Sequence, residues 1–225
     1  MVIDSSKVKG IIFDIDGTLL DTMPMWAHVS EKYIVDRGKI PEEDLGDKVL
    51  AMTINEGTAY VKEKYNFEDP VEDIREAFLS MIRKFYYEEA PFLPGAKELV
   101  LELHRKNIPM VLCTSGDRDL ATNAFKRLGV FDKFKGLVTC NEHNTHKGER
   151  YIFELASEML LDGPVTEEDY KDIYVFDDSL KAIKTVKEMG MIAVAMEDEL
   201  GKTFWEALKQ TGDYYIKNLG EVSVD

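Results

Sequence analysis

Two aspartates near the start of the chain have a spacing that suits a metal-assisted reaction. Asp14 and Asp16 are two positions apart and directly follow the apolar run 11–13. In an extended chain such residues point to the same side, so their carboxylates would lie within about 7 Å and repel each other unless a cation lay between them. Mg²⁺ is a hard ion that prefers oxygen ligands, so the pair predicts a magnesium site.

Two other interpretations of this segment remain open. A surface turn of the Asp-Gly type would account for Gly17, which permits a sharp bend. A calcium-binding loop would account for the acidic residues, but such a loop has its glycine later than Gly17 and needs a further bidentate Glu. Because a surface turn does not explain a preceding run as apolar as 11–13, the segment favours the functional interpretation.

A second polar group follows the apolar run 108–113. Thr114 and Ser115 stand there, with Gly116 directly behind them and a helical pattern after it. Hydroxyl groups and free backbone N–H groups before a helix can bind an anion. Thr and Ser at such a place are more often only a helix cap, and taken alone the pattern favours the cap.

Two more groups have the same kind of position. Asp177 and Asp178 follow the run 173–176. Capping of the next helix explains one of these carboxylates, but it does not explain the second. Lys147 stands just before a helical pattern, where its ammonium could neutralise a phosphoryl oxygen, although a single lysine in a loop is usually solvated.

An α/β fold must position these residues, because short apolar runs alternate with longer segments whose apolar residues have helical spacing. The strand-like runs are 8–13, 108–113, 137–139, 173–176 and 191–194. Ligands of open α/β sheets bind at the carboxyl ends of the strands, and all four polar groups fall at or just after such ends. The sequence therefore predicts a doubly wound parallel sheet with one ligand site at that edge.

The interval between the first two strands differs from the rest, since its apolar residues form helical stripes only. Val29, Val61 and Phe78 are members of three such stripes. We therefore predict a small all-helical domain at residues 22–90, inserted after the first strand of a core domain that comprises residues 1–21 and 91–225. A lid over the site and an inert packing domain are both open interpretations.

Composition restricts the partners. The 225 residues include 28 Lys and Arg against 43 Asp and Glu, and the formal net charge of −15 would repel nucleic acids and anionic membranes. Cys113 and Cys140 are the two cysteines, which favours a reducing, cytoplasmic compartment over secretion. The longest uncharged stretch, 107–116, is half of the roughly 20 residues that cross a bilayer, and residues 1–9 lack the apolar region of a signal peptide.

As a set, these motifs resemble the haloacid dehalogenase superfamily. The resemblance spans residues 10 to about 196 and rests on Asp14-x-Asp16-Gly17-Thr18, Thr114 after a strand, Lys147 at a helix start and Asp177-Asp178 after another strand. The helical insert is similar to the cap of the β-phosphoglucomutase-like branch. The resemblance implies a Rossmann-like core with this cap.

The resemblance also implies a catalytic and a metal-binding set. Asp14 would be the nucleophile that forms an aspartyl-phosphate, and Asp16 the general acid and then the general base. Mg²⁺ would be held by the Asp14 carboxylate, the Asp16 backbone carbonyl and Asp178, with Asp177 assisting.

The phosphoryl group would have its own set of ligands. The resemblance implies that the Thr114 hydroxyl, the Ser115 backbone N–H and Lys147 hold the phosphoryl oxygens and offset their charge. The expected activity is Mg²⁺-dependent hydrolysis of the phosphate monoester of a small phosphorylated metabolite, by an enzyme expected to be a monomer.

Two alternative functions remain. The sugar phosphomutases of this branch usually carry a Gly-x-Ser-Arg loop in the cap, and the comparable stretch 50–56 has no arginine, so a phosphomutase is the weaker alternative. A non-catalytic module that binds a phosphorylated metabolite is the other, and Asp14 and Asp16 argue against it because such a module needs neither nucleophile nor acid.

Substrate choice is expected of the cap, because the core motifs hold only the phosphoryl group. Candidate pocket-lining residues are Met23, Met25, Trp26 and Met52. For Trp26, packing inside the cap is the stronger interpretation, because the residue belongs to an apolar helical stripe.

Overall fold

The computed structural model describes residues 1–50 and 52–225. The chain forms two compact units, Met1–Asp21 with Pro91–Asp225 and Thr22–Ala90. We call the first the sheet unit and the second the helical unit.

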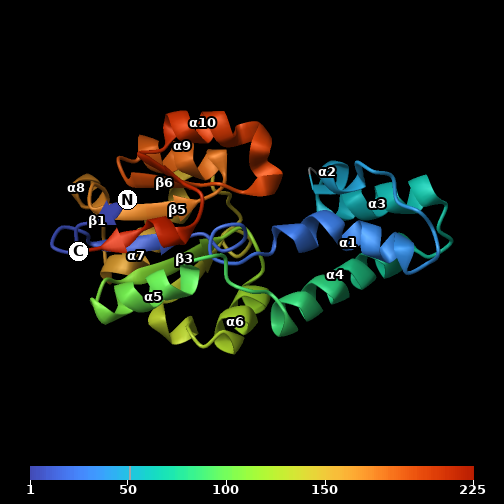
Figure 1. Ribbon diagram of the computed structural model, residues 1–225, viewed down its shortest axis with the longest axis horizontal. Coiled ribbons are helices and arrows are strands. Elements are labelled where there is room, and N and C mark those ends of the chain that lie inside the picture. Colours follow the sequence, from blue (N-terminus) through green and yellow to red (C-terminus); the bar gives the residue numbers. More distant parts are fainter. Residues whose placement is uncertain (51) are drawn as a thin grey trace. The chain divides into compact units, whose positions relative to one another are not determined.

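A six-stranded parallel sheet carries the sheet unit (Figure 1). Its strands are β2 (Gly10–Phe13), β3 (Met110–Thr114), β4 (Gly136–Thr139), β5 (Ile173–Asp177), β6 (Ile192–Met196) and β7 (Tyr214–Ile216). Their order is β4-β3-β2-β5-β6-β7, so the chain starts in the middle of the sheet, extends to one edge and then to the other. The order reverses at β2, and in open α/β sheets the carboxyl ends at such a reversal form the ligand site.

Helices connect these strands. They are α5 (Ala96–Arg105), α6 (Arg118–Arg127), α7 (Arg150–Leu161), α8 (Glu167–Tyr170), α9 (Leu180–Glu188) and α10 (Trp205–Thr211), with short 3₁₀ helices η1 (Phe131–Lys133), η2 (Glu199–Phe204) and η3 (Leu219–Glu221). None of the helices in the described ranges is long and apolar enough to cross a membrane.

One hydrophobic cluster joins three of these helices to the sheet. Ile152 of α7, Ile183 of α9 and Leu208 of α10 are buried with Val111 and Val175 of the strands. Burying such an aliphatic side chain stabilises the fold by about 1.5–3 kcal/mol relative to leaving it in water. The central strands β2, β3 and β5 are continuous apolar runs because helices cover their faces and neighbouring strands flank them.

The predicted fold class is confirmed, since the five expected strands and the helices between them are present. Three short strands were not predicted: β7 at the sheet edge, and β1 (Val2–Ile3) and β8 (Ser223–Val224), which form a separate parallel pair. Each is only two or three residues long and partly exposed, so none produces a recognisable apolar run.

The helical unit consists, within the described residues, of α1 (Met23–Val35), α2 (Leu45–Leu50), α3 (Ile54–Tyr65) and α4 (Val71–Glu88). Its interior contains an aromatic cluster in which the Tyr33 ring meets Phe67 and Phe78 edge-on, each with ring centroids 5.3 Å apart. A capping box of Thr53 and Glu56 starts α3, because each side chain accepts the other residue's N–H.

The chain leaves the sheet unit and returns to it at neighbouring residues. The Asp21 N–H donates to the Pro91 carbonyl over 3.0 Å, and Leu20 forms an antiparallel bridge with Phe92. We call these four residues the entry clasp. The two ends of the inserted segment are therefore held together within the sheet unit itself.

Candidate active site

The central strand presents Asp14 at the carboxyl edge of the sheet. The Asp14 N–H donates to the Phe176 carbonyl of β5 over 2.9 Å, so the residue extends the ladder of β2. The chain then turns back, because the Ile15 carbonyl accepts the Leu20 N–H over 2.8 Å. Gly17, with φ of 81°, adopts the left-handed conformation that this turn needs and that favours glycine.

Both oxygens of the Asp14 carboxylate are engaged. Lys147 donates to Asp14 Oδ1, and the Thr18 hydroxyl donates to Asp14 Oδ2 over 3.1 Å. Lys147 also donates to Asp177 Oδ2 over 2.7 Å. The exposed fractions of Asp14, Lys147 and Asp177 are 5%, 7% and 1%, so the interpretation of Lys147 as a solvated loop lysine is wrong.

Three carboxylates gather at this point. Asp14, Asp177 and Asp178 each offer one oxygen, and these oxygens all lie within 4.8 Å of one another. The Lys147 ammonium is the positive charge that pairs with two of them. When all four groups are ionised, their net charge is therefore −2. Oxygen donors with such a charge excess suit a hard divalent cation.

The electrostatics of the group reflect its burial. Burial raises the pKa of Asp177 to about 6, and the Asp14 charge adds to the rise, while Lys147 opposes it. Burial and then the charges of Asp14 and Asp177 raise the pKa of Asp178 well above its usual range. Burial disfavours the Lys147 ammonium, but the Asp14 and Asp177 carboxylates outweigh it and raise the pKa of Lys147.

Asp177 serves two purposes at once. Its Oδ1 accepts the Ser179 N–H over 2.8 Å and so fixes the turn before α9, while its Oδ2 faces Lys147. One carboxylate oxygen of Asp177 therefore stabilises the local turn, and the other belongs to the site. Asp178, the other member of the pair, contributes its carboxylate to the three-carboxylate group.

Asp16 belongs to a different side of the site. Its Oδ2 lies so close to Gly116 that a Cβ built on the glycine would be 3.2 Å away from it. The Asp16 carboxylate therefore approaches the loop after β3, whereas the Asp14 carboxylate faces Asp177 and Asp178 at the end of β5.

The loop after β3 brings in Thr114 and Ser115. Thr114 ends the strand and is buried, and its Oγ1 accepts the Gly116 N–H over 2.8 Å. Ser115 is exposed, and its hydroxyl lies 3.7 Å from Cys140 Sγ. The interpretation of Thr114 and Ser115 as a helix cap is wrong, because Asp117 caps α6 by accepting two backbone N–H groups.

The sequence did not reveal an ion pair that joins a helix start to a loop near the site. Arg118 forms two hydrogen bonds of 2.6 Å to the Glu142 carboxylate and a third of 2.8 Å to the Leu137 carbonyl. The pair ties the start of α6 to the loop that leads from β4 to Lys147. Arg118 and Glu142 are 24 positions apart, so no local pattern could have identified them. Thr18 was also missed as a partner of Asp14, although it stands inside the first motif.

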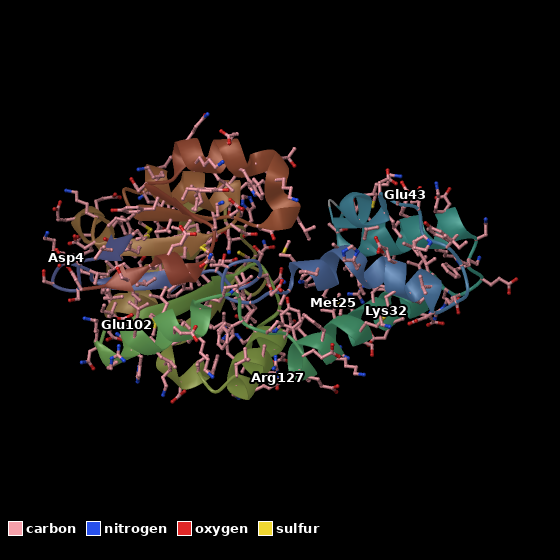
Figure 2. The ribbon with its side chains drawn as sticks, viewed as in Figure 1. Asp4, Met25, Lys32, Glu43, Glu102 and Arg127 are labelled. Carbon is pink, nitrogen blue, oxygen red and sulfur yellow. The ribbon has the colours of Figure 1, made fainter. Side chains whose placement is uncertain are left out.

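In the helical unit the candidate pocket residues Met23, Met25, Trp26 and Met52 are all half-buried. Met25, labelled in Figure 2, lies near the start of α1. The Trp26 indole N–H donates to the Tyr86 hydroxyl of α4 over 2.9 Å. This contact supports a packing role for Trp26 within the helical unit.

The stretch 50–56 includes Ala51, which lies outside the described residues. An arginine does reach this stretch from elsewhere in the helical unit: Arg75 of α4 donates from Nε to Asn55 Oδ1 over 2.9 Å. The absence of arginine from the stretch itself therefore does not leave it without a guanidinium neighbour.

Comparison with known proteins identifies the family to which the chain is similar. The model of the haloacid dehalogenase-like hydrolases matches residues 8–190. A phosphorylated carbohydrates phosphatase from Thermotoga maritima is 24% identical over 184 residues, which are 82% of this chain and 82% of the relative. A β-phosphoglucomutase from Bacillus subtilis is 25% identical over 227 residues, 95% of each chain.

The fold has a close counterpart among solved structures. The crystal structure of a Thermotoga maritima protein has a TM-score of 0.79 to this chain at 22% identity. The match covers 93% of this chain and 94% of the other. It extends over both units, so the sheet and its helical insert occur together in that protein.

Proposed function

Because the chain belongs to the haloacid dehalogenase-like hydrolase family, we propose that it is a Mg²⁺-dependent phosphatase of small-molecule phosphate monoesters. One observation carries the proposal. Asp14 is a buried carboxylate at the end of the central strand that accepts hydrogen bonds from Lys147 and Thr18 and lies beside two further carboxylates. The phosphorylated carbohydrates phosphatase among its relatives supports the same reaction class.

In the first step an Asp14 carboxylate oxygen attacks phosphorus, and the bond from phosphorus to the leaving oxygen breaks. The electron pair of that bond goes to the leaving oxygen, which takes a proton from the Asp16 carboxylic acid. The products are an alcohol and an aspartyl-phosphate on Asp14, with Asp16 ionised.

In the second step water attacks the phosphorus of the aspartyl-phosphate. The Asp16 carboxylate accepts a proton from this water, and the bond between phosphorus and the Asp14 oxygen breaks. Inorganic phosphate leaves, and both residues return to their starting protonation states. Asp16 thus acts first as acid and then as base.

Three groups position the phosphoryl oxygens in both steps. These are the Lys147 ammonium, the Thr114 hydroxyl and the Ser115 backbone N–H. Phosphoryl transfer passes through a loose transition state, so positioning and charge compensation supply most of the catalysis. Lys147 provides local positive charge in a chain whose formal net charge is −15.

The donor set fits the metal that the family implies. The Asp14, Asp177 and Asp178 carboxylates are hard oxygen donors in excess of the Lys147 charge. Asp14, Asp178 and the Asp16 backbone carbonyl would hold Mg²⁺, with Asp177 assisting. When bound, the ion offsets the negative charge of the phosphoryl group.

The substitution Asp14→Asn tests this proposal. We expect it to abolish Mg²⁺-dependent phosphate release from a panel of sugar, polyol and nucleoside phosphates, while circular dichroism and the unfolding temperature stay close to those of the wild type. Undiminished turnover in the variant would reject Asp14 as the nucleophile. Binding of a phosphorylated compound by a wild type that turns over none would instead favour a non-catalytic binding module.

A phosphomutase is the second candidate, favoured by two observations. The β-phosphoglucomutase relative matches 95% of this chain, and Arg75 reaches the stretch 50–56 where phosphomutases carry their arginine loop. A phosphomutase would need priming by a bisphosphorylated sugar and would transfer phosphate between two positions of the sugar. Release of free phosphate from β-glucose 1-phosphate without such priming would exclude it.

The division of labour between the units is part of the proposal. Residues 1–21 and 91–225 form the catalytic core, and residues 22–90 form a cap that selects the small phosphorylated metabolite. Met23, Met25 and Met52 are the cap residues we assign to this selection. Substitution of Met25 by alanine should then change the ratio of the KM values for different phosphate esters, while activity on at least some of them is kept.

A further inference from the structure

Gly116 lies at a crowded point between two groups of the proposed mechanism. A Cβ built on this glycine would come within 3.2 Å of Asp16 Oδ2 and, on the same scale, within 3.2 Å of Thr114 Oγ1. Such separations are shorter than ordinary van der Waals contact, so either neighbour would have to move by a few tenths of an ångström. Because Gly116 has no side chain, Asp16 Oδ2 and Thr114 Oγ1 can both lie next to this position.

A hydrogen bond adds to this arrangement. The Gly116 N–H donates to Thr114 Oγ1 over 2.8 Å, two residues back along the chain. A hydroxyl has one proton to donate and can accept in addition, so this contact directs the Thr114 oxygen while leaving its own O–H as a donor. Gly116 therefore binds Thr114 through its N–H and lies next to the Asp16 carboxylate at the place that a Cβ would take.

The glycine is not explained by its backbone conformation. Gly17, Gly38, Gly95, Gly129 and Gly190 have positive φ, and Gly116 is not among them. An alanine can therefore adopt the backbone of residue 116 without strain. Space, rather than conformational freedom, is what the missing side chain provides.

We propose that Gly116 is a positioning residue that sets the place of the Asp16 carboxylate relative to the Thr114 hydroxyl. The inference rests on the proposed function, in which Asp16 protonates the leaving oxygen and Thr114 holds a phosphoryl oxygen. Both groups act on the same phosphate ester, so their separation must match the distance between its leaving oxygen and its phosphoryl oxygens. A displacement of Asp16 weakens proton donation before it weakens binding of the phosphoryl group.

This role has a specific kinetic signature. Proton donation matters most when the leaving group is a poor one, because a stable leaving anion departs without a proton. Phenyl phosphate and p-nitrophenyl phosphate differ in this respect and share the same ring. A misplaced Asp16 should therefore slow the phenyl ester much more than the p-nitrophenyl ester.

The experiment compares Gly116→Ala with the wild type on these two esters in the presence of Mg²⁺. We expect kcat/KM for phenyl phosphate to fall about tenfold, as small displacements of a catalytic group cost on this order, and kcat/KM for p-nitrophenyl phosphate to fall less than about twofold. The value of kcat/KM is used because it reports the steps up to release of the phenol. A crystal structure of the variant should show Asp16 Oδ2 displaced by a few tenths of an ångström.

Gly163→Ala is the matched control. Gly163 also lies in the sheet unit, its φ is not positive, and a Cβ there would meet nothing within 4 Å. We expect this variant to behave as the wild type on both esters.

The outcomes distinguish a failure of the Gly116 inference from a failure of the proposed phosphatase function. Equal falls on both esters in Gly116→Ala, or no fall on either, would overturn the positioning role and leave the phosphatase proposal standing. An Asp16 carboxylate that stays in place in the variant crystal would overturn it as well. A wild type that releases phosphate from neither ester would overturn the proposed function and this inference with it.

Discussion

Two clusters of charged residues in this protein are built from similar pairs and behave in opposite ways. In the sheet unit Lys147 bridges Asp14 and Asp177, all nearly inaccessible to water. In the helical unit Glu42 accepts the Tyr60 hydroxyl and lies 3.1 Å from Lys48 Nζ and 3.2 Å from Lys64 Nζ. The side chains of Lys48 and Lys64 are 38% and 48% exposed, so this second cluster is in contact with solvent.

The pKa shifts of the two clusters have opposite signs. Burial raises the pKa of Asp177 to about 6 despite its lysine partner. The Tyr60 hydroxyl, and then Lys48, lower the pKa of Glu42 to about 2, because at this half-buried place, open to solvent, desolvation is the smaller effect. Pairing a carboxylate with a lysine therefore does not decide the sign of its shift, and the surrounding solvent does.

The largest effect should come from removing the cation of the buried cluster. Lys147→Met leaves the Asp14 and Asp177 carboxylates buried without their ammonium, and we expect it to lower the free energy of unfolding by about 3–5 kcal/mol. Urea unfolding at pH 7 in the presence of EDTA measures this. Lys181→Met, at an exposed position of α9, is the control. A change in Lys147→Met no larger than in this control would show that the buried cluster is not held together by its charges.

A smaller effect is expected from pH. Because the folded pKa of Asp177 is raised from 3.8 to about 6, its contribution to stability is present below pH 4 and is lost as the pH rises through about 6. Urea unfolding in EDTA from pH 4 to pH 7 should show the decline. Asp177→Asn keeps an oxygen for the Ser179 N–H and should flatten the curve; an unchanged slope in this variant would assign the decline to other groups.

The smallest effect should come from the exposed cluster. The pKa of Glu42 is lowered, so its contribution is present above the usual pKa of 4.5 and is lost as the pH falls through about 2. Since exposed pairs contribute little, we expect Glu42→Gln to lower the unfolding temperature at pH 7 by less than about 2 °C, with the difference vanishing as the pH approaches 2. Thermal unfolding between pH 2 and pH 7 tests this, with Glu63→Gln as control. A drop as large as that of Lys147→Met would contradict the contrast drawn between the clusters.

The fold was largely predictable because the central strands of its sheet are buried throughout. Runs such as 11–13 and 173–176 are apolar without interruption, which is the pattern of a buried parallel strand. Strand β7 escaped prediction because Tyr214 and Tyr215 are partly exposed at the sheet edge. Helix α2, between two stripes that were identified, escaped because it is only six residues long.

For the candidate site, the sequence offered motifs but not the contacts between them. Asp14 and Lys147 could be selected from the sequence, but their mutual contact depends on strand order, which brings residues 133 positions apart together. The Arg118–Glu142 pair has no sequence pattern, because the pairing of β3 and β4 is what brings the start of α6 beside the loop after β4. Asp117 was overlooked as the cap of α6, since the hydroxyls before it offered a competing explanation.

The entry clasp has a consequence for how the molecule tolerates change. The inserted segment leaves and re-enters the sheet unit at residues that are hydrogen-bonded to each other. The entropic cost of closing such a loop rises only slowly with the number of residues in it. For the sheet unit, the whole segment between Asp21 and Pro91 therefore has the role of a hairpin turn: it connects two neighbouring, paired stretches of chain. Insertions, deletions or exchange of that segment for an unrelated one can therefore leave the register of β2, β3 and β5 untouched.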